Sequence, residues 1–351
     1  MISTDSRSEA PAAAIPSPPS GERGETSTMK AAVRRQYGSL DLVHLAEIDR
    51  PVAKAGEVLV RVRAAGVDRG VWHLMTGRPY LMRIAGVGLR APKNPVLGMD
   101  LAGVVEAVGA NVTRFQPGDE VFGVGTGSFA EYALVREDKL AHKPDNLTFE
   151  QAAVIGISGS TALQALRDHG HVQPGQEVLL IGASGGVGTF ALQIAKALGA
   201  RVTAVCSTSK VELVRSLGAD RVVDYTRDDF AASESRYDLI IDIGGNSTLA
   251  RLRRALTPKG TLVIVGGEGG GAWFGGIDRQ LRAMMLSMFV GQKLVSFINK
   301  ENHKDLIVLK DLIESGKVAP VIDRTYPLAE VPDAIWRLQE GKARGKIAIS
   351  V

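Results

Sequence analysis

Three glycines at three-residue spacing mark the segment whose chemistry is most readily predicted. Gly182, Gly185 and Gly188 directly follow the apolar run 177–181, and a helical pattern of apolar residues comes after them. Glycine here lets the main chain turn sharply and approach a pyrophosphate, while the N–H groups and dipole of the helix face the phosphates. The segment predicts a dinucleotide site, although a plain strand–helix turn could carry the same glycines. The predicted contact residues are Gly182, Ala183, Ser184, Gly185, Gly186, Val187 and Gly188.

The end of the next predicted strand bears on which dinucleotide is bound. An NAD site usually has an acid there, about 20 residues on, which accepts a hydrogen bond from the ribose 2′-OH. Here the strand 202–205 ends in Cys206-Ser-Thr-Ser-Lys210, without an acid. The Ser207 hydroxyl and the Lys210 ammonium suit a 2′-phosphate, and Tyr225, beyond the third strand, could add a donor. We therefore predict NADPH over NADH; the alternative is that Lys210 is an ordinary solvated residue.

Further cofactor contacts are expected at the carboxyl ends of neighbouring strands, where open parallel sheets bind ligands. Glycine pairs follow the fourth and fifth predicted strands, and two hydroxyls lie at a predicted helix start in 156–162. The glycines could equally fill turns, and the hydroxyls could be simple N-caps. An aromatic residue at the end of the last strand could cover a nicotinamide. These predicted contacts are Ser158, Thr161, Ile243, Gly244, Val265, Gly266 and Phe297.

The elements that must position these residues fall into two patterns. Before residue 147, short β-branched or alternating runs are separated by Gly- and Pro-rich turns, which predicts an all-β, partly barrel-like module. From Phe149 onward strands and helices alternate, which predicts a parallel, doubly wound sheet of the Rossmann type. The predicted strands are 30–34, 58–64, 101–108 and 120–123 in the first part, and 178–181, 201–205, 221–223, 239–243, 261–265 and 294–298 in the second.

In the last fifty residues the regular alternation of strands and helices ends. A helix is predicted at 304–315, then a Pro-containing strand, a helix near 331–340 and a closing strand at 346–351. We therefore assign 29–150 and 300–351 to one catalytic domain and 151–299 to an inserted Rossmann domain. Residues 1–28 are rich in Ala, Pro, Ser and Gly and lack an apolar signal core, so we expect a disordered leader.

Bulk composition excludes several classes of function. The net charge of +4 comes from basic residues scattered among acids, so neither nucleic acid nor a membrane is an expected partner. The single cysteine, Cys206, excludes a disulfide framework and a multi-cysteine zinc site, and it suits a reducing compartment, for which we predict the cytoplasm. No stretch reaches the roughly 18 to 20 apolar residues that a membrane span needs.

Taken together, the motifs resemble the medium-chain dehydrogenase/reductase superfamily, on its quinone oxidoreductase-like branch. The resemblance runs from Met29 to Val351 in the expected order and implies a GroES-like catalytic domain, an inserted Rossmann domain and a cleft between them. The segments that carry it are 30–32, 51–62, 65–68, 98–106, 115–123, 127–132, the glycine loop and 345–347.

The departures from zinc-dependent alcohol dehydrogenases of that superfamily affect the predicted chemistry most. Those enzymes have a cysteine where this chain has Asp68, and a His-Glu pair where it has Met99-Asp100. A thioether does not replace an imidazole in an ordinary zinc site, and the third-ligand region around Gly156 has no cysteine or histidine. The lobe that would carry four structural cysteines is absent. We therefore predict no metal.

Without a metal to stabilise an alkoxide, hydride delivery to a conjugated acceptor is the easier reaction. The resemblance agrees, since similar zinc-free members are quinone oxidoreductases and enone or enoyl reductases. We predict NADPH-dependent reduction of a quinone or an α,β-unsaturated carbonyl compound. The alternatives are metal-free ketone/alcohol interconversion and a non-catalytic NADPH-binding protein on the same fold. The predicted edge strand and the resemblance favour a homodimer.

The segment 67–80 occupies the place where the family lines its substrate cleft. Asp68 stands where related quinone reductases usually have Asn, and His73 lies near a position that often holds Tyr. We hypothesise that His73 or Tyr80 donates a hydrogen bond or a proton to the developing enolate oxygen, and that Asp68 orients nearby groups or the nicotinamide ribose. Alternatively, His73 only packs beneath a loop, and water supplies the proton.

Overall fold

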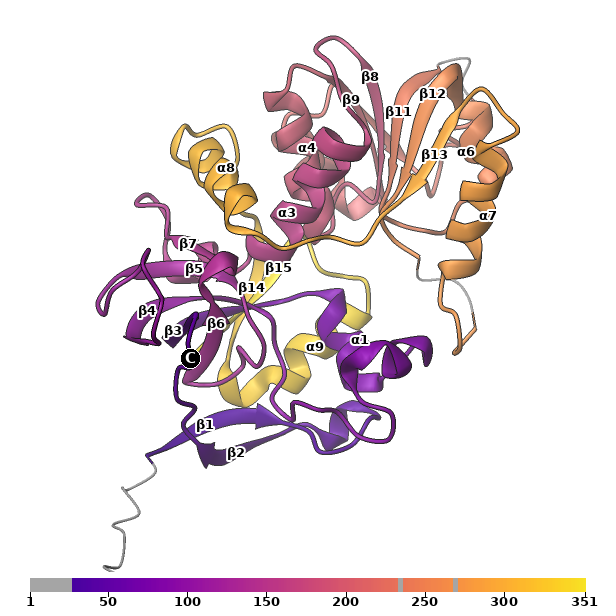
Figure 1. Ribbon diagram of the computed structural model, residues 1–351. Coiled ribbons are helices and arrows are strands. Elements are labelled where there is room, and N and C mark those ends of the chain that lie inside the picture. The colour runs from indigo at the N-terminus through magenta and orange to yellow at the C-terminus, as the bar shows by residue number, and fades with distance from the viewer. Residues whose placement is uncertain (1–26, 233–235, 268–270) are drawn as a thin grey trace, which may run out of the picture.

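The computed structural model describes residues 27–232, 236–267 and 271–351. In Figure 1 a parallel sheet with helices on both faces forms one body, and a β-rich body lies against it. The chain makes most of the β-rich body first, then the parallel sheet, and then returns to the β-rich body with its last strands.

The parallel sheet has six strands in the order β10-β9-β8-β11-β12-β13, and every neighbouring pair is parallel. This is the doubly wound order in which the chain reverses direction beside β8, so the carboxyl ends of the strands meet at one edge. The strands are β8 (Glu177–Ile181), β9 (Arg201–Cys206), β10 (Arg221–Asp224), β11 (Tyr237–Asp242), β12 (Leu256–Ile264) and β13 (Lys293–Ser296).

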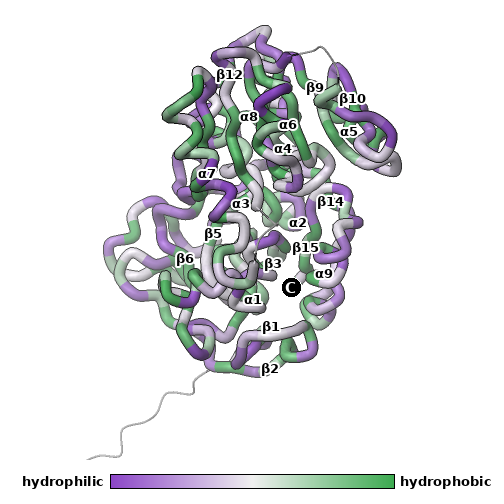
Figure 2. The backbone as a smooth tube through the Cα atoms, turned by 90° about the vertical axis from the view of Figure 1, so that its right-hand side faces the viewer, coloured by the Kyte–Doolittle hydropathy of each residue, from purple (hydrophilic) through white to green (hydrophobic). Residues whose placement is uncertain are grey.

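Both faces of this sheet are buried, which explains why its strands are continuous apolar runs. Val178 and Leu180 of β8 pack into one hydrophobic cluster, while Leu179 and Ile181 pack into another on the opposite face. The first cluster includes side chains of α3 (Gly156–Gln164), α4 (Gly186–Ala197), α5 (Val211–Ser216) and α8 (His303–Glu314); the second includes α6 (Leu249–Ala255) and α7 (Ile277–Ser287). Figure 2 shows the apolar residues concentrated along these strands.

The β-rich body is built on a seven-stranded sheet in the order β14-β15-β3-β4-β5-β7, with β6 also paired to β3. Its C-terminal strand β15 pairs antiparallel with β3, so the last residues complete the sheet that the first residues began. A separate hairpin of β1 and β2 lies beside it. The elements are β1 (Thr28–Val33), β2 (His44–Asp49), β3 (Glu57–Val67), β4 (Asp100–Val108), β5 (Glu120–Val124), β6 (Tyr132–Arg136), β7 (Leu140–His142), β14 (Ile322–Pro327), β15 (Lys346–Ser350), α1 (Arg69–Thr76), α2 (Phe149–Ala152) and α9 (Val331–Gln339).

The predicted strands and the doubly wound sheet are confirmed, with ends that differ by a few residues. Three strands were missed: β2, β6 and β7. In β2 only Ala46 and Ile48 face the protein, and both are only half-buried, so its apolar pattern is short and weak; β7 has only three residues. The first strand begins at Thr28, inside the range assigned to the leader; the rest of that predicted leader, residues 1–26, lies outside the described residues.

Candidate active site

The glycine loop connects β8 to α4 by a turn that other residues would obstruct. Gly182 has φ +87°, a left-handed conformation that favours glycine. A Cβ on Gly188 would overlap the carbonyl oxygen of Gly182 and lie 2.8 Å from the Cα of Ala183, so only glycine lets the helix approach the strand this closely. A Cβ on Gly185 would meet only the Gly182 oxygen, at 3.6 Å, which leaves the outer side of the loop open.

The N-terminus of α4 fits a pyrophosphate. Its N-cap residue is Gly185, and among the described residues no side chain accepts a hydrogen bond from the first turn. The free N–H groups of Gly186, Val187 and Gly188 are then available to an anion, and the helix dipole adds to the attraction. This geometry suits the predicted cradle, with Ala183 buried beneath the loop, and the nucleotide contacts of these residues stay a prediction.

The predicted glycines of the neighbouring strands gather beside this loop. Gly182 faces Gly244, whose nitrogen would lie 3.1 Å from an added Cβ. The N–H groups of Ile243 and Gly244 donate to the Ile181 oxygen at 3.0 and 3.3 Å. A Cβ on Gly266 would overlap the Ile243 oxygen, and Val265 donates to Asp242. The ends of β8, β11 and β12 thus form one continuous edge.

A basic pocket of about 420 Å³ lies at the end of β9, next to the glycine loop, between the two bodies. The Lys210 ammonium crosses this junction and donates to the carbonyl oxygens of Gly341 and Ala343 at 2.9 and 2.8 Å. Partial burial lowers the pKa of Lys210, Asp323 opposes that change, and Arg344 adds to it. The lining residues are Ser207, Ser209, Lys210, Asp323, Arg337, Gly341, Lys342 and Arg344.

Two observations qualify the predicted nucleotide contacts at this end. Tyr225 is 61% exposed, and its N–H donates to the Cys206 oxygen, so it stands at the rim. Asp224, at the end of β10, is an acid near Ser207 that sequence spacing did not flag. Its carboxylate accepts hydrogen bonds from the hydroxyls of Thr208 and Thr226 at 2.5 and 2.8 Å. Asp224 is therefore already hydrogen-bonded within the protein and is less available to a ribose hydroxyl.

A buried ion pair lies beneath the N-termini of α3 and α4. The Lys346 ammonium lies 3.3 Å from Asp100 Oδ2 and 3.1 Å from Ser158 Oγ, and Asp100 Oδ1 accepts from the Ile157 N–H at 2.7 Å. Burial, with a smaller contribution from nearby Asp68, raises the pKa of Asp100 to about 7, although the charge of Lys346 opposes this rise. Predicted contacts Ser158 and Thr161 are both buried on α3.

Asp68 begins α1 and lies close to this pair. Its Oδ1 accepts from the Gly70 N–H at 2.7 Å, as an N-cap does, and Oδ2 is buried without a hydrogen-bond partner among the described residues. Burial raises the pKa of the Asp68 carboxyl, and the Lys346 charge partly offsets that rise. A buried oxygen of this kind is usually satisfied by a donor, so Oδ2 is a candidate acceptor for a ligand hydroxyl.

His73 is half-buried on α1, and its hydrogen bonding restricts what it can donate. Its Nδ1 lies 2.8 Å from the Arg78 carbonyl oxygen, so Nδ1 carries hydrogen and donates there. On the neutral ring Nε2 is then bare, and only the imidazolium form can donate from Nε2. Trp72 packs edge-on against this ring at 5.4 Å. Both predicted roles, packing and donation, are compatible with this geometry.

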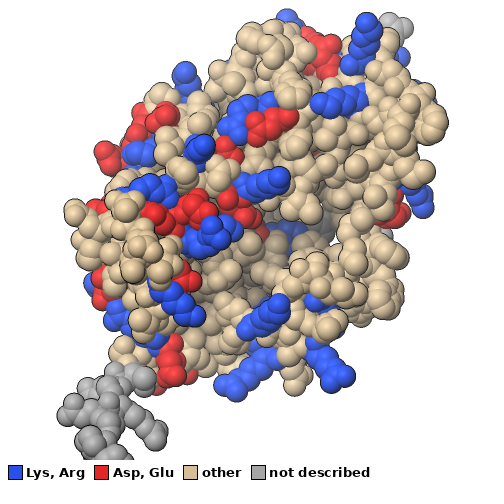
Figure 3. All heavy atoms as spheres, in the orientation of Figure 1, with Lys and Arg blue, Asp and Glu red and all other residues tan. Residues whose placement is uncertain are grey.

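Tyr80 connects the two bodies at the cleft. Its N–H donates to the Ala272 oxygen at 2.8 Å, and its ring packs edge-on against Trp273 at 5.3 Å. The Arg83 guanidinium lies 4.7 Å from the same ring. Figure 3 shows a hollow between the upper and lower bodies, with basic side chains gathered below it. No pattern in the sequence predicts that Trp273 contacts Tyr80.

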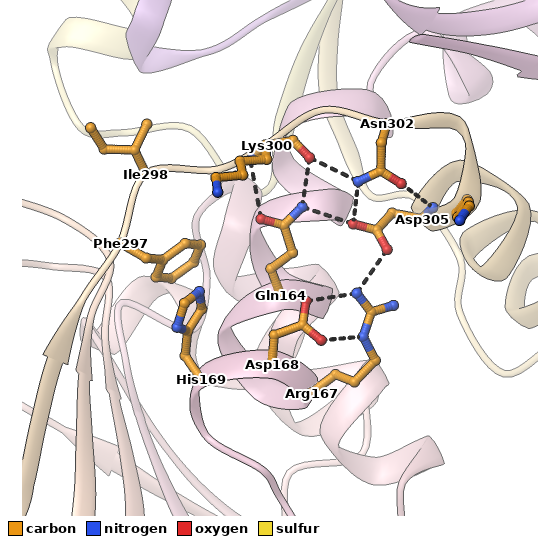
Figure 4. Close-up of a pocket in the computed structure, with 10 residues that line it drawn as sticks. Gln164, Arg167, Asp168, His169, Phe297, Ile298, Lys300, Asn302 and Asp305 are labelled. Atoms are coloured by element: carbon orange, nitrogen blue, oxygen red, sulfur yellow. Dashed lines mark hydrogen bonds and ion pairs between the residues drawn. The ribbon is translucent and has the colours of Figure 1, made fainter. Parts of the chain in front are cut away.

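Phe297 is placed in a different pocket from the glycine loop. It stacks on His169 with ring centres 4.2 Å apart, in a cavity of about 970 Å³ between α3 and the chain that follows β13. Figure 4 shows Gln164, Arg167, Asp168 and Asp305 of this cavity hydrogen-bonded to one another. The role predicted for Phe297 over a nicotinamide stays a prediction.

Asp100 and Lys346 were not among the predicted site residues. Asp100 was considered only as a residue at the family's zinc-ligand position, and Lys346 only as part of the segment 345–347 that carries the family resemblance. A further signal was a charged residue at the start of a mainly apolar strand, in 100–108 and 346–350. Across the described ranges, no three His, Cys, Asp or Glu side chains form a group that could hold a metal, and no helix is long and apolar enough to cross a membrane.

Two protein-family models match the chain. Residues 54–145 match the alcohol dehydrogenase GroES-like domain, which confirms the predicted fold of the β-rich body, and residues 217–349 match a family described as zinc-binding dehydrogenase.

Known proteins match nearly the whole chain. A mitochondrial NAD(P)H oxidoreductase of Mus musculus is 33% identical, over 96% of this chain and 94% of that protein. A 2-methylene-furan-3-one reductase of Solanum lycopersicum is also 33% identical, over 92% of this chain and 79% of that protein. Among solved structures, the quinone oxidoreductase from Coxiella burnetii is similar with a TM-score of 0.82 and 26% identity, over 93% of this chain and 100% of that one.

Proposed function

The chain belongs to the medium-chain dehydrogenase/reductase superfamily, on its quinone oxidoreductase-like branch, and from that premise we propose that it is a zinc-independent, NADPH-dependent reductase of quinones or α,β-unsaturated carbonyl compounds. NAD(P)H-dependent oxidoreduction follows from the family itself. The observation that carries the finer proposal is the combination of an open, uncapped phosphate cradle with a reaction centre made of carboxylates, a thioether and an ammonium.

The basic pocket at the end of β9 supports NADPH as the cofactor. It has four cationic side chains, Lys210, Arg337, Lys342 and Arg344, against one acid, Asp323, which is paired with Arg337. Lys210 uses two of its three N–H groups on carbonyl oxygens, so one remains for a phosphate oxygen. A 2′-phosphate needs such donors, and a ribose hydroxyl does not.

The side chains at the position of a family zinc site support metal independence. Both oxygens of Asp100 are engaged, by the Ile157 N–H and by Lys346, and one oxygen of Asp68 is engaged by Gly70. The third side chain, Met99, supplies a thioether, which is a poor zinc ligand beside carboxylates. An ammonium beside these carboxylates also repels a divalent cation. The matched family name includes zinc, so metal analysis of the purified protein is a direct test.

The chemistry requires few protein groups. When bound, the reduced nicotinamide supplies the hydride, and the protein supplies orientation and electrostatics. Asp68 Oδ2 accepts a hydrogen bond from a hydroxyl of the nucleotide ribose or of the substrate. His73, as the imidazolium, or Tyr80 donates to the oxygen on which negative charge develops when the conjugated acceptor is reduced. Water is the alternative proton source, which a His73 variant distinguishes.

The test is a screen of NADPH and NADH oxidation with short-chain enones, quinones and simple ketones, on protein whose zinc content has been measured. We expect oxidation of NADPH by an enone or a quinone at less than about 0.1 zinc per chain. Ketone reduction that depends on zinc would contradict the proposal. Nucleotide binding without turnover on any acceptor would favour a non-catalytic NADPH-binding protein instead.

The proposed partners are a small-molecule substrate and a second copy of the chain. Strand β13 is the edge of the parallel sheet, and beside it α7 and the residues after it expose an apolar stripe of Leu281, Met284, Met285, Met288 and Phe289. An open strand edge beside an apolar helix face fits a symmetric interface. Light scattering is expected to give the mass of a dimer, and Met285→Glu to give that of a monomer; a monomeric wild-type protein would refute this.

The proposed location is the cytoplasm, because the only cysteine, Cys206, is buried and unpaired, which suits a reducing compartment. The mouse relative is named as mitochondrial. Fractionation of native cells with an antibody to the protein tests this, and recovery outside the cytoplasmic fraction would contradict it.

A further inference from the structure

Lys346 is a buried lysine for which the proposed reaction has no direct use. Its side chain is 2% exposed, and its ammonium contacts Asp100, which is 0% exposed, and Ser158. Burial of an ion pair costs several kcal/mol of desolvation, which the attraction recovers only when the geometry is good. Well-packed apolar residues would often be as stable at such a place, so stability alone does not explain the pair.

The position of the pair in the molecule points to a role. Strand β15, which begins at Lys346, belongs to the β-rich body, yet its start lies against the glycine loop of the parallel sheet. The N–H of Gly345 donates to the Ser184 oxygen at 2.9 Å, and Gly345 forms a parallel bridge with Gly185. A Cβ on Gly186 would lie 2.8 Å from Lys346 Cδ, so the first residue of α4 rests directly on this side chain.

The charge of Lys346 is unusual for its surroundings. It lies beside the N-terminal turns of both α3 and α4, where the helix dipoles already place partial positive charge and where anions are the favoured neighbours. Asp100 compensates, because one of its oxygens caps α3 and the other pairs with Lys346. As a result, a cation and its carboxylate partner, both from the β-rich body, lie under the phosphate cradle of the parallel-sheet body.

The charge of Lys346 also acts on Asp68, which lies on the α1 side of the cleft and is called here the Asp68 wall. Lys346 is the strongest charge acting on Asp68, whose Oδ2 is buried and unpartnered among the described residues. The Lys346 ammonium therefore contacts β4 and α3, its side-chain carbons lie beside the first residue of α4, and its charge acts on the N-cap residue of α1.

We propose that Lys346 is a positioning residue that holds the phosphate cradle in register with the Asp68 wall of the cleft, through Asp100 and Ser158 on one side and Gly186 on the other. This inference rests on the proposed function, since it concerns the site for the pyridine nucleotide. Lys346 acts through these neighbours and need not touch the nucleotide itself.

The test separates positioning from stability by means of a double variant. Lys346→Met alone leaves the Asp100 carboxylate buried and unpaired, which lowers the melting temperature and could prevent folding. The double variant Lys346→Met/Asp100→Asn removes both charges and keeps an amide oxygen as acceptor for the Ile157 N–H. It is expected to melt close to the wild-type protein.

Affinity for NADPH is then measured by fluorescence titration of the full-length double variant. We expect its Kd for NADPH to rise by about tenfold or more, and its KM for NADPH to rise more than its kcat falls. The reason is that the glycine loop and the first turn of α4 would no longer be held in the orientation that binds the nucleotide. The matched control is Lys143→Met, which removes another buried lysine, one that donates to Pro144 and Leu147 and pairs with Glu120. It is expected to lower the melting temperature and leave the Kd unchanged.

The outcomes distinguish the two proposals. If the wild-type protein binds no NADPH, the proposed function fails, and this inference fails with it. If the wild-type protein binds NADPH and the folded double variant binds it equally well, only the role of Lys346 is overturned. A loss of affinity in Lys143→Met equal to that of the double variant would also overturn it, because burial alone would then explain the effect.

Discussion

The glycine loop after β8 and the polar groups around α1 offer their ligands different kinds of contact. The loop presents main-chain N–H groups at an uncapped helix end, and glycines keep its surface open. The α1 side presents a carboxylate, an imidazole and a phenol, each already engaged with a neighbour or packed against one. Main-chain N–H groups bind a chemical group, such as a phosphate, that is common to the ligands of many enzymes. Side chains select one substrate. In our proposal the loop binds the part of the cofactor that many reactions share, and the α1 side determines which acceptor is reduced.

The largest effect is expected where the loop geometry leaves no space. In Gly188→Val the added side chain overlaps the Gly182 carbonyl oxygen and pushes α4 away from β8. We expect NADPH affinity to fall by about 100-fold or more, as measured by calorimetry. Gly271→Val is the control, because a Cβ there meets nothing within 4 Å. Equal affinity in the two variants would show that the loop does not hold the cofactor.

The α1 side is tested without disturbing the loop by His73→Ala. We expect kcat/KM for the acceptor to fall about 100-fold, the size usual for loss of a general acid, while the Kd for NADPH stays unchanged. His44→Ala is the matched control, since its Nδ1 also faces a main-chain carbonyl, 3.4 Å away, on the surface. Unchanged turnover in His73→Ala would leave water as the proton source.

Lys210→Glu tests the pocket that joins the two bodies. The change removes one donor to a 2′-phosphate and adds repulsion, so we expect the Kd for NADPH to rise about 30-fold, while that for NADH changes less than about threefold. Lys317→Glu, on an exposed turn after α8, is the control. A parallel loss of affinity for both nucleotides would show that Lys210 only holds the loop 341–343 in place.

The smallest expected effect concerns stability against pH. Burial raises the pKa of Asp100 to about 7 in the folded protein, whereas an unfolded aspartate titrates near 4. The folded state thus binds the proton more tightly, so this carboxyl favours folding below about pH 4, and its contribution is lost as the pH rises to about 7. In Asp100→Asn, the change in melting temperature between pH 4 and pH 7 is expected to be smaller than in the wild-type protein by a few degrees. A slope equal to that of the wild-type protein would contradict the assignment.

The same contrast explains what could be predicted from sequence. The glycine loop was predictable because its chemistry lies within seven consecutive residues and depends on backbone geometry. The Lys346–Asp100 contact joins residues 246 positions apart, and Lys210 meets a carbonyl 131 positions away. No local pattern encodes such pairs, because the return of β15 to β3 creates them.

Phe297 illustrates the same limit within one element. Sequence placed it at the end of the last parallel strand, which β13 confirms to within a residue. The direction of its side chain depends on His169, which stacks on it from the end of the π-helical turn Ala165–His169 that follows α3. Tyr80 was expected in the cleft, but its partner Trp273 comes from the other body. Strand ends are local properties, whereas side-chain partners are properties of the packed fold.

Hydride transfer from NADPH without a metal is tested most directly by the rate at which metal-depleted protein oxidises NADPH. Protein treated with a chelator and shown to be free of zinc is mixed with NADPH and a short enone or quinone. We predict an unchanged rate before and after chelation, and no increase when zinc is added back. A rate that disappears with the metal and returns with zinc would contradict the account.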